Sequence, residues 1–443
     1  MNAPTAVLLA IGEEILRGEV TDTNSAWLGE RLSALGFRVA AGMTVADREG
    51  DIVDAFRRAV SLAPVVVVTG GLGPTGDDLS APAAAKFAGV EVVKSPEAVA
   101  GIAKRMKCRP EAVTGNRLRM AMIPMGARVY PNPEGSAPGI HMQVSGVRPS
   151  VLDDSHPLAA GRSQRPAADT QHLFLLPGVP REMRAIFDES IAPALEELFP
   201  DRPRRHARLL HVSGWPESQA DHEAREALAD LLRDGRLEIG TKLGRGWVSL
   251  RVAAEGPDGA GLVDRAAGVL KKRFGESQWG EGPQRLEDAV AKQLSDRNLT
   301  LSLAESCTGG RITSRLVSVP GISASLVSGL VTYSNESKIH LLGLSPGIIE
   351  RHGAVSAACA KAMASGLRAS SGADINLAVT GIAGPDGGSA NKPVGTVHFA
   401  VATPRGVKHD VQNFGGTREW VRERASSYGL WLIWRTAGRD IDR

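Results

Sequence analysis

The 443-residue sequence contains few cysteines and few aromatic residues, and it has no long apolar run. Its three cysteines, Cys108, Cys307 and Cys359, lack the spacing of a metal site, and we expect a reducing, cytoplasmic environment. Aromatic residues make up only 4% of the chain and basic residues form no long run, which argues against a nucleic-acid partner. No apolar stretch approaches the ~20 residues that span a bilayer, so we expect no membrane partner.

Length and composition instead indicate several ordinary folded domains. Hydrophobic residues make up 42% and charged residues 23% of the chain, as in typical globular proteins. At ~150 residues per domain, the length predicts about three domains. The pattern of elements predicts α/β domains over residues 1–200 and 284–443, with a small α+β module over 201–283. We interpret Gly280–Gln284, which is rich in Gly and Pro, as the linker that precedes the last domain.

The first domain is predicted to contain a parallel sheet, because short β-rich runs alternate with helical patterns. The predicted strands and helices lie at 6–11, 23–35, 37–43, 51–61 and 65–69. From residue 141 to 171 the sequence loses this periodicity and gathers Pro, Ser, Gly and Arg. We expect a long, mobile surface loop there.

A glycine-rich loop, Thr69–Ser80 (TGGLGPTGDDLS), lies between a predicted strand and a helical run. Residues without side chains, such as Gly71 and Gly73, let backbone N–H groups approach a phosphate, and the next helix adds a favourable dipole. Thr75 lies in the same loop. We interpret the G-x-G-x-x-G match completed by Gly76 as accidental, because a dinucleotide fingerprint should follow the first strand.

Two carboxylates, Asp77 and Asp78, stand where a Walker loop would carry its lysine. Beside a phosphate site they suggest a divalent metal that bridges carboxylate and pyrophosphate. The alternative is that one or both are simply helix caps. Glu14, Asp22 and Asn24 follow the first predicted strand, at the edge where parallel sheets hold ligands, although Asp22 or Asn24 can also cap the next helix.

A turn in the last domain carries candidates for nucleophilic chemistry. AESCTGG (Ala304–Gly310) follows a predicted buried strand and contains Ser306 and Cys307. Hydrolysis of an amide needs a nucleophile and donors that hold the oxyanion. Lys338 in VTYSNESK is the candidate base for Ser306, as in Ser–Lys amidases, and a solvated surface lysine is the alternative. Cys307 is the rival nucleophile, but cysteine is also a residue type that is often simply buried.

Several long motifs resemble the CinA family of competence/damage-inducible proteins. In the first domain they are IGEEILRGEVTDTNSAWLGERL, TGGLGPTGDDLS, NPEGSAPG and LPGVPREM, and in the last domain AESCTGG, VTYSNESK, GAVS, TGIAGPDGG and KPVGTV. The resemblance implies a molybdopterin-binding-like fold with ADP-ribose pyrophosphatase activity at the N-terminus. It also implies a KH-type middle module and a C-terminal nicotinamide mononucleotide deamidase. Met120, where we expect Gln, and the apparent insertion at 141–171 depart from the pattern.

The resemblance assigns roles to the candidate residues of the last domain. Ser306 is expected to be the nucleophile and Lys338 its base, with Tyr333 relaying a proton or orienting the lysine unless it serves only in packing. The expected oxyanion donors are the N–H groups of Thr308, Gly309 and Gly310. The glycine loop TGIAGPDGG is expected to bind the mononucleotide phosphate through the amides of Thr380, Gly381 and Ala383, unless it is a plain turn. We expect no metal requirement in this domain.

For the first domain we expect substrate binding by Asn24, Gly71, Gly73 and Thr75. A divalent metal, Mg, Mn or Co, would be held by Glu14, Asp77 and Asp78. Two alternatives remain, namely a domain that binds a pterin or nucleotide without hydrolysis, and a nucleic-acid partner in the competence machinery. We expect small nucleotides as substrates and a homodimer.

Overall fold

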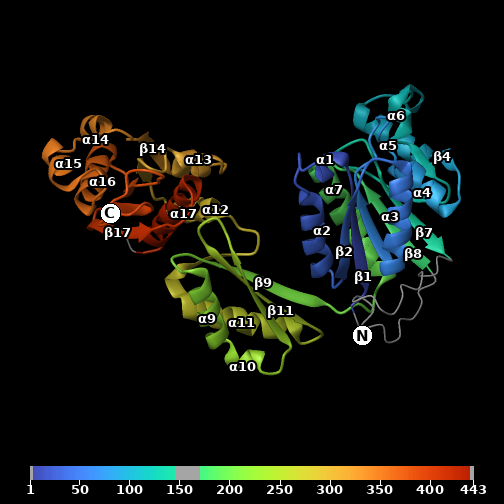
Figure 1. Ribbon diagram of the computed structural model, residues 1–443, viewed down its shortest axis with the longest axis horizontal. Coiled ribbons are helices and arrows are strands. Elements are labelled where there is room, and N and C mark those ends of the chain that lie inside the picture. The colour runs from blue at the N-terminus through green and yellow to red at the C-terminus, as the bar shows by residue number, and fades with distance from the viewer. Residues whose placement is uncertain (1–2, 146–169, 440–443) are drawn as a thin grey trace. The chain divides into compact units, whose positions relative to one another are not determined.

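The computed structural model describes residues 3–145 and 170–439, and the chain divides into two compact units (Figure 1). The first unit consists of Met1–Arg205 with Glu255–Pro257, and the second of His206–Ala254 with Asp258–Arg443. The predicted boundaries near residues 200 and 283 remain predictions. Among the described residues, no helix is both long and apolar enough to cross a membrane.

A six-stranded sheet in the order β2-β1-β3-β8-β7-β6 forms the centre of the first unit. Its strands are β1 (Thr5–Ile11), β2 (Arg38–Val45), β3 (Val65–Thr69), β6 (Arg128–Tyr130), β7 (Gly139–Ser145) and β8 (Thr170–Leu176). The first three strands and β8 are parallel, whereas β7 and β6 are antiparallel. The predicted parallel sheet is therefore confirmed for β1, β2 and β3, and β7 and β6, which were not predicted as strands, extend the sheet through antiparallel pairs.

The prediction of a surface loop over residues 141–171 is partly wrong. Residues 141–145 and 170–171 belong to β7 and β8, which pair with each other. Apolar side chains such as Met142 and Val144 alternate with polar ones in β7, a short strand signal that the surrounding Pro and Gly residues obscured. Residues 146–169 lie outside the described residues.

Helices cover both faces of this sheet (Figure 1). The unit's helices are α1 (Glu13–Leu16), α2 (Thr23–Ala34), α3 (Glu49–Leu62), α4 (Ser80–Ala88), α5 (Pro96–Met106), α6 (Asn116–Arg119), α7 (Pro180–Ile186) and α8 (Ala192–Leu198). Leu28 and Leu32 of α2 lie one turn apart and pack on one face, together with α7 and α8. Asp22 caps α2, because its carboxylate accepts from Ser25 N–H at 2.9 Å.

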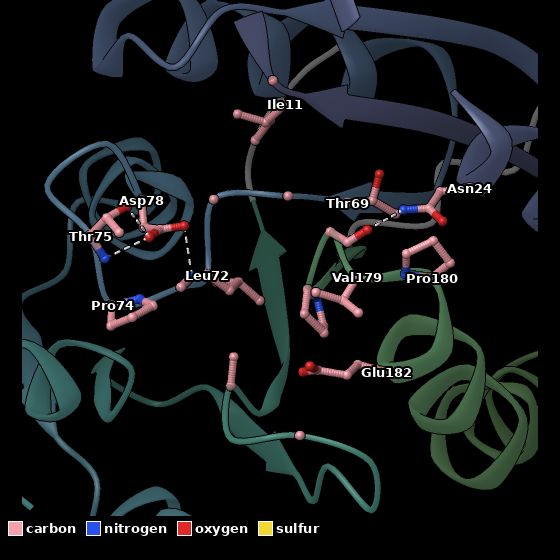
Figure 2. A pocket seen from close by; sticks show the side chains of 18 of the residues that line it. Ile11, Asn24, Thr69, Leu72, Pro74, Thr75, Asp78, Val179, Pro180 and Glu182 are labelled. Carbon is pink, nitrogen blue, oxygen red and sulfur yellow. Dashed lines mark hydrogen bonds between the residues drawn. The ribbon is translucent and has the colours of Figure 1, made fainter. Parts of the chain in front are cut away.

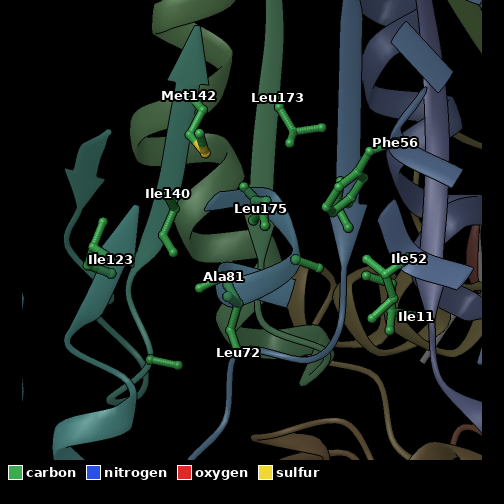
Figure 3. Packing of buried hydrophobic residues seen from close by; sticks show 14 of the residues in the cluster. Ile11, Ile52, Phe56, Leu72, Ala81, Ile123, Ile140, Met142, Leu173 and Leu175 are labelled. Atoms are coloured by element: carbon green, nitrogen blue, oxygen red, sulfur yellow. The ribbon is translucent and has the colours of Figure 1, made fainter. Parts of the chain in front are cut away.

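The other face of the sheet packs against α3, α4 and α5. Figure 3 shows Ile52 and Phe56 of α3 and Ala81 of α4 around the sheet residues Ile140 and Leu175. A separate antiparallel pair, β4 (Val92–Lys94) and β5 (Met122–Pro124), lies next to α4. Since β1 is buried along its whole length, its continuous apolar run reflects cover on both faces.

The second unit contains a four-stranded sheet, β10-β11-β9-β12, with helices against one face. Its elements are β9 (Arg205–Val212), α9 (Glu217–Ala227), α10 (Ala229–Leu232), β10 (Leu237–Leu243), β11 (Val248–Glu255), α11 (Gly259–Phe274) and β12 (Gln278–Glu281). Gly280 and Glu281 pair with β9, so the predicted linker is wrong for these two residues. Trp279 beside them is buried among aromatic rings, and this contact with residues distant in sequence keeps a Gly-rich segment in a strand. The KH-type assignment remains a prediction.

A five-stranded sheet, β14-β13-β15-β16-β17, completes the second unit. Its strands are β13 (Leu301–Glu305), β14 (Leu326–Val331), β15 (Ile375–Gly381), β16 (Thr396–Thr403) and β17 (Gly406–Asn413). One face packs against α12 (Leu286–Asp296), α13 (Arg311–Val317) and α17 (Arg418–Ala437), and the other against α14 (Asn335–Leu342), α15 (Pro346–His352) and α16 (Ala357–Ser371). The strands β13, β14 and β15 are parallel, so their carboxyl ends share one edge.

Candidate functional site

Ser306 lies at this shared edge of the five-stranded sheet, directly after β13. Its N–H donates to the Val379 carbonyl of β15 at 3.0 Å. On the other side, Thr332 N–H donates to the Glu305 carbonyl at 2.8 Å. The turn that carries Ser306 is therefore tied to both neighbouring strands, which fixes the backbone from which the hydroxyl projects.

Lys338 approaches Ser306 from α14. The side chain of Ser334 caps this helix by accepting from Ser337 N–H at 3.0 Å. One turn in, Lys338 turns back over the loop, so that its Nζ lies 3.1 Å from Ser306 Oγ. The same Nζ lies 2.8 Å from the Thr332 carbonyl and 3.0 Å from the Tyr333 carbonyl. The lysine is 1% exposed, which contradicts the alternative of a solvated surface residue.

The surroundings of Lys338 favour its neutral form. Burial lowers the pKa of Lys338 below its ordinary value of 10.5, although Cys359, Cys307 and Glu336 oppose the shift. A neutral lysine has two N–H groups and one lone pair, and two short contacts to carbonyls can hold the two N–H groups. The lone pair is then available to the hydroxyl of Ser306.

Cys307, the rival nucleophile, is buried beside Ser306. Burial raises the pKa of the Cys307 thiol to about 12. A cysteine attacks as its thiolate, which is scarce at neutral pH when the pKa is so high. The geometry therefore favours Ser306.

A cavity of about 190 Å³ opens next to these side chains. Its lining residues are Ser306, Cys307, Tyr333, Asn335, Lys338, Ala354, Val355, Thr380, Gly381, Ala383 and Arg418. The expected phosphate-binding residues of the second glycine loop are thus at the cavity. Thr308, Gly309 and Gly310 are not among the lining residues, and Gly309 N–H donates to the Ser306 carbonyl at 3.1 Å. That amide is engaged in closing the turn, contrary to the expectation of a free donor.

Tyr333 lies at the mouth of this cavity and is 62% exposed. Its hydroxyl lies 3.2 Å from Arg418 Nη2, while its backbone carbonyl contacts Lys338. The described contact with the lysine is therefore made by the backbone of Tyr333. A role of its hydroxyl in proton transfer remains a prediction.

The first unit contains a larger cavity, of about 960 Å³, at the carboxyl ends of β1 and β3 (Figure 2). All seven of the candidate residues predicted for this domain line it, namely Glu14, Asn24, Gly71, Gly73, Thr75, Asp77 and Asp78. Asn24 Nδ2 donates to the Gly178 carbonyl at 2.7 Å, which joins α2 to the segment before α7 (Figure 2). The sheet thus brings these residues to one edge, as a parallel arrangement predicts.

Asp78 closes the glycine loop (Figure 2). Its Oδ1 accepts from Gly73 N–H at 2.7 Å, and its Oδ2 accepts from Thr75 N–H at 2.7 Å and from Thr75 Oγ1 at 2.6 Å. These two amides are therefore occupied within the loop, where we had expected them to face a phosphate. Gly71 has φ +67°, and a Cβ there would lie 2.4 Å from Ser80 Oγ, so this position requires glycine.

The large cavity is strongly acidic. Seven carboxylates line it but only two arginines, Arg105 and Arg117. The seven are Glu14, Asp22, Asp47, Asp77, Asp78, Glu134 and Glu182. Asp22, Asp47, Asp78 and Glu182 accept hydrogen bonds from the protein, and Glu134 pairs with Arg181. Glu14 and Asp77 have no such partner within the described part of the chain.

The expected metal site of the first domain is not preassembled from side chains of the described residues. Within residues 3–145 and 170–439, no group of three or more His, Cys, Asp or Glu side chains is arranged to bind a metal ion. Mg²⁺ is usually bound by one or two carboxylates together with substrate phosphates and water. Glu14 and Asp77 are the two carboxylates of the cavity that have no protein partner within the described residues, so they are the ones free to bind a ligand.

Comparison with known proteins identifies the family. A family model for the CinA C-terminal domain matches residues 283–437, and one for a molybdopterin binding domain matches residues 7–197. A CinA-like protein of Geotalea uraniireducens is 38% identical over 434 residues, which cover 96% of each chain. The chain belongs to the CinA family. A relative from Alkaliphilus metalliredigens, named as a competence-damage inducible protein, is 35% identical over 430 residues, covering 96% of this chain and 97% of the relative.

Solved structures of CinA proteins match parts of the chain. The CinA protein from Thermoplasma acidophilum is 33% identical, with a TM-score of 0.36, and the match covers 44% of this chain and 98% of that one. A competence/damage inducible protein from Agrobacterium tumefaciens is 38% identical, with a TM-score of 0.34, and covers 35% of this chain and 94% of its own. The predicted fold class is confirmed: a molybdopterin-binding-like α/β domain precedes a CinA C-terminal domain.

Sequence reasoning missed one functional candidate of this CinA-family chain, Arg418. It is the first residue of α17, and its Nη1 donates to the Gly384 carbonyl at 2.7 Å. The guanidinium thus lies at the cavity of Ser306, beside the second glycine loop. In the sequence, Arg418 stands among alternating charges at the start of a helix, which is typical of a solvated surface. No local signal marks it.

Proposed function

We propose that the last domain hydrolyses nicotinamide mononucleotide to nicotinate mononucleotide and ammonia. The observation that carries the proposal is the 3.1 Å contact between Ser306 Oγ and a buried lysine amine at a cavity. A serine hydroxyl needs a base to attack an amide, and a desolvated lysine is one of the few side chains that can act so. The choice of this particular amide comes from the resemblance of the motifs.

The reaction would proceed in two steps. Ser306 Oγ bonds to the amide carbon while its proton passes to Lys338 Nζ. As the C–N bond breaks, Lys338 returns the proton to the leaving nitrogen, which departs as ammonia and leaves an ester on Ser306. Water, deprotonated by the same amine, then cleaves the ester to give the carboxylic acid and regenerate the serine hydroxyl.

The charge at the cavity supports a phosphorylated substrate. Arg418 places a permanent cation at its lining, next to Thr380, Gly381 and Ala383. Arginine binds phosphate well because its planar donors match two oxygens at once. We propose that the phosphate lies toward Arg418 while the carboxamide lies at Ser306.

Product analysis of the full chain tests this proposal. The chain is incubated with nicotinamide mononucleotide in H₂¹⁸O, and products are identified by mass spectrometry. We expect nicotinate mononucleotide carrying ¹⁸O in its carboxylate, with ammonia released in equal amount. Release of free nicotinamide, which would mean cleavage of the glycosidic bond, contradicts the proposal.

For the first unit we propose a metal-dependent pyrophosphatase that cleaves ADP-ribose to AMP and ribose 5-phosphate. The observation that favours it is the acidic cavity beside a glycine loop that follows a parallel strand. A divalent metal held by Glu14 and Asp77 would neutralise the pyrophosphate when bound. The two proposed activities would serve pyridine nucleotide recycling in a cytoplasmic homodimer.

A chelator should stop cleavage of ADP-ribose and leave deamidation unchanged, because only the first unit's proposed chemistry involves a metal. Asp77→Asn and Asp78→Asn should each lower ADP-ribose hydrolysis by at least about tenfold, the first through the metal and the second through the opened loop. Asp54→Asn, an exposed carboxylate on α3, is the control. Anion-exchange chromatography of the nucleotide products measures the rate of ADP-ribose cleavage and the rate of deamidation. Full activity with chelator, or in Asp77→Asn, contradicts the metal-dependent proposal and favours the alternative of a binding domain.

A further inference from the structure

Attack on an amide by Ser306 places negative charge on the carbonyl oxygen of the substrate, and this oxyanion needs hydrogen-bond donors. Serine hydrolases often combine a donor of the nucleophile turn with one from a second segment. In the turn of Ser306, the N–H groups of Ser306 and Gly309 are engaged with the Val379 and Ser306 carbonyls. Thr308 and Gly310 do not line the cavity. A second segment at the cavity is therefore expected to supply a donor.

The GAVS motif, Gly353–Ser356, forms such a segment. It connects α15 to α16, and Ala354 and Val355 line the cavity of Ser306. Within residues 3–145 and 170–439, the N–H of Val355 has no hydrogen-bond acceptor. Backbone N–H groups that are removed from water are nearly always paired, so an unpaired amide at a cavity is available to a ligand.

Side chains hold this segment in place. Thr380 Oγ1 donates to the Ala354 carbonyl at 2.8 Å. Because the peptide group between Ala354 and Val355 is planar, fixing its carbonyl also fixes the direction of the Val355 N–H. Next to it, Ser356 Oγ donates to the Gly353 carbonyl at 2.9 Å. The N–H of Val355 is thus oriented before a substrate arrives, which is the condition for stabilising charge in a transition state.

The helix that follows the motif adds a favourable dipole. α16 begins at Ala357, two residues after Val355, and is 15 residues long. The N-terminus of a helix carries partial positive charge and favours an anion near it. Cys359 in the first turn of α16 belongs to the same packed cluster as Ala304 of β13, two residues before Ser306. The positive end of α16 therefore lies near the end of the strand that carries the nucleophile.

We propose that the backbone N–H of Val355 is an oxyanion donor of this site and that Thr380 positions it. The proposal rests on the proposed function of the last domain, because that reaction forms the oxyanion. When Ser306 Oγ bonds to the amide carbon, the carbonyl π electrons move to the oxygen, which accepts from the Val355 N–H. When the C–N bond breaks, the carbonyl double bond forms again and this hydrogen bond weakens.

Replacing Val355 with its α-hydroxy acid, by nonsense suppression in the full chain, tests the donor. The change turns one amide into an ester, so it removes the N–H and keeps the side chain. We expect kcat for nicotinamide mononucleotide to fall by about a hundredfold or more, with KM nearly unchanged. The same exchange at Ala357 is the control and should leave kcat at the parent value, because Ala357 lies at the same helix end but does not line the cavity.

An ester at residue 355 also makes the Ala354 carbonyl a weaker acceptor, and Thr380→Val separates this effect. The variant keeps the size of the side chain and removes the hydroxyl that holds the peptide. We expect kcat to fall about tenfold with KM nearly unchanged, the loss of one hydrogen bond, and Thr380→Ser to recover most of the loss. A loss in the ester variant no larger than in Thr380→Val, or a higher KM at unchanged kcat, would overturn the donor.

Acetylation by p-nitrophenyl acetate separates the donor from the choice of nicotinamide mononucleotide as substrate. Ser306 Oγ bonds to the acetyl carbon, its proton passes to Lys338, and nitrophenolate leaves; absorbance and the mass of the acetylated chain measure the rate. We expect the ester at Val355 to slow this step by about a hundredfold as well. If the parent is acetylated and the variant is slow, the donor stands even where no nicotinamide mononucleotide is consumed. Deamidation at the parent kcat by the variant overturns the donor alone, and a parent chain inactive in both assays overturns both proposals.

Discussion

Replacing Ser306 with alanine is expected to abolish ammonia release from nicotinamide mononucleotide, with kcat falling by at least about a thousandfold. The variant removes the only side-chain atom that bonds to the amide carbon in the proposed reaction. The change is small, and the backbone N–H of residue 306 keeps its bond to the Val379 carbonyl, so the fold should remain. Ammonia release and circular dichroism measure the two effects separately.

Cys307→Ala is the matched control for Ser306→Ala. Cys307 is the neighbouring residue on the same turn, and burial keeps its pKa high at about 12. The variant should retain much of the deamidase activity. The reverse pattern, with activity in Ser306→Ala and none in Cys307→Ala, would make the cysteine the nucleophile.

Lys338→Met should lower kcat by about a hundredfold to ten-thousandfold, the usual contribution of a general base. Methionine retains the length of the chain and its apolar stem but cannot accept a proton. Lys361→Met, on the exposed face of α16, is the control because it removes a lysine away from the cavity. Wild-type activity in Lys338→Met would refute the lysine as the base.

The pH profile provides an independent test of Lys338. Only the neutral amine accepts the Ser306 proton, so kcat/KM should rise with pH as Lys338 loses its proton. Because burial lowers the pKa of Lys338, this rise should occur below the ordinary lysine value of 10.5. A rise centred at or above that value would show that the amine is not desolvated in the working enzyme.

Much of the local structure was predictable because it depends on short-range patterns. The apolar run at β3 and the i, i+4 leucines of α2 predict a strand and a helix, and both were confirmed. Ser306 and Lys338 were recognised from their motifs, and the structure brings them to 3.1 Å. Asp22 was recognised as a candidate cap from its place before α2.

Contacts between distant segments were not predictable in this way. β7 and β6 pair in antiparallel fashion because of the edge of the sheet at which the chain re-enters it. The strand β12 forms because Trp279 packs among aromatic residues that are distant in the sequence. Arg418 reaches the cavity only because α17 begins beside the second glycine loop. None of these relations leaves a periodic signal in the sequence.

The sequence by itself determined the family motifs, the main strands and helices, and the pairing of a serine with a lysine as candidates, since each depends on neighbouring residues or on a recognisable motif. Only the tertiary structure decided how the polar groups are used. It turned Asp78 toward the loop amides, buried the Cys307 thiol and gathered seven carboxylates around one cavity. The physical reason is that hydrogen-bond partners and desolvation depend on which side chains surround a group, and long-range packing sets those surroundings.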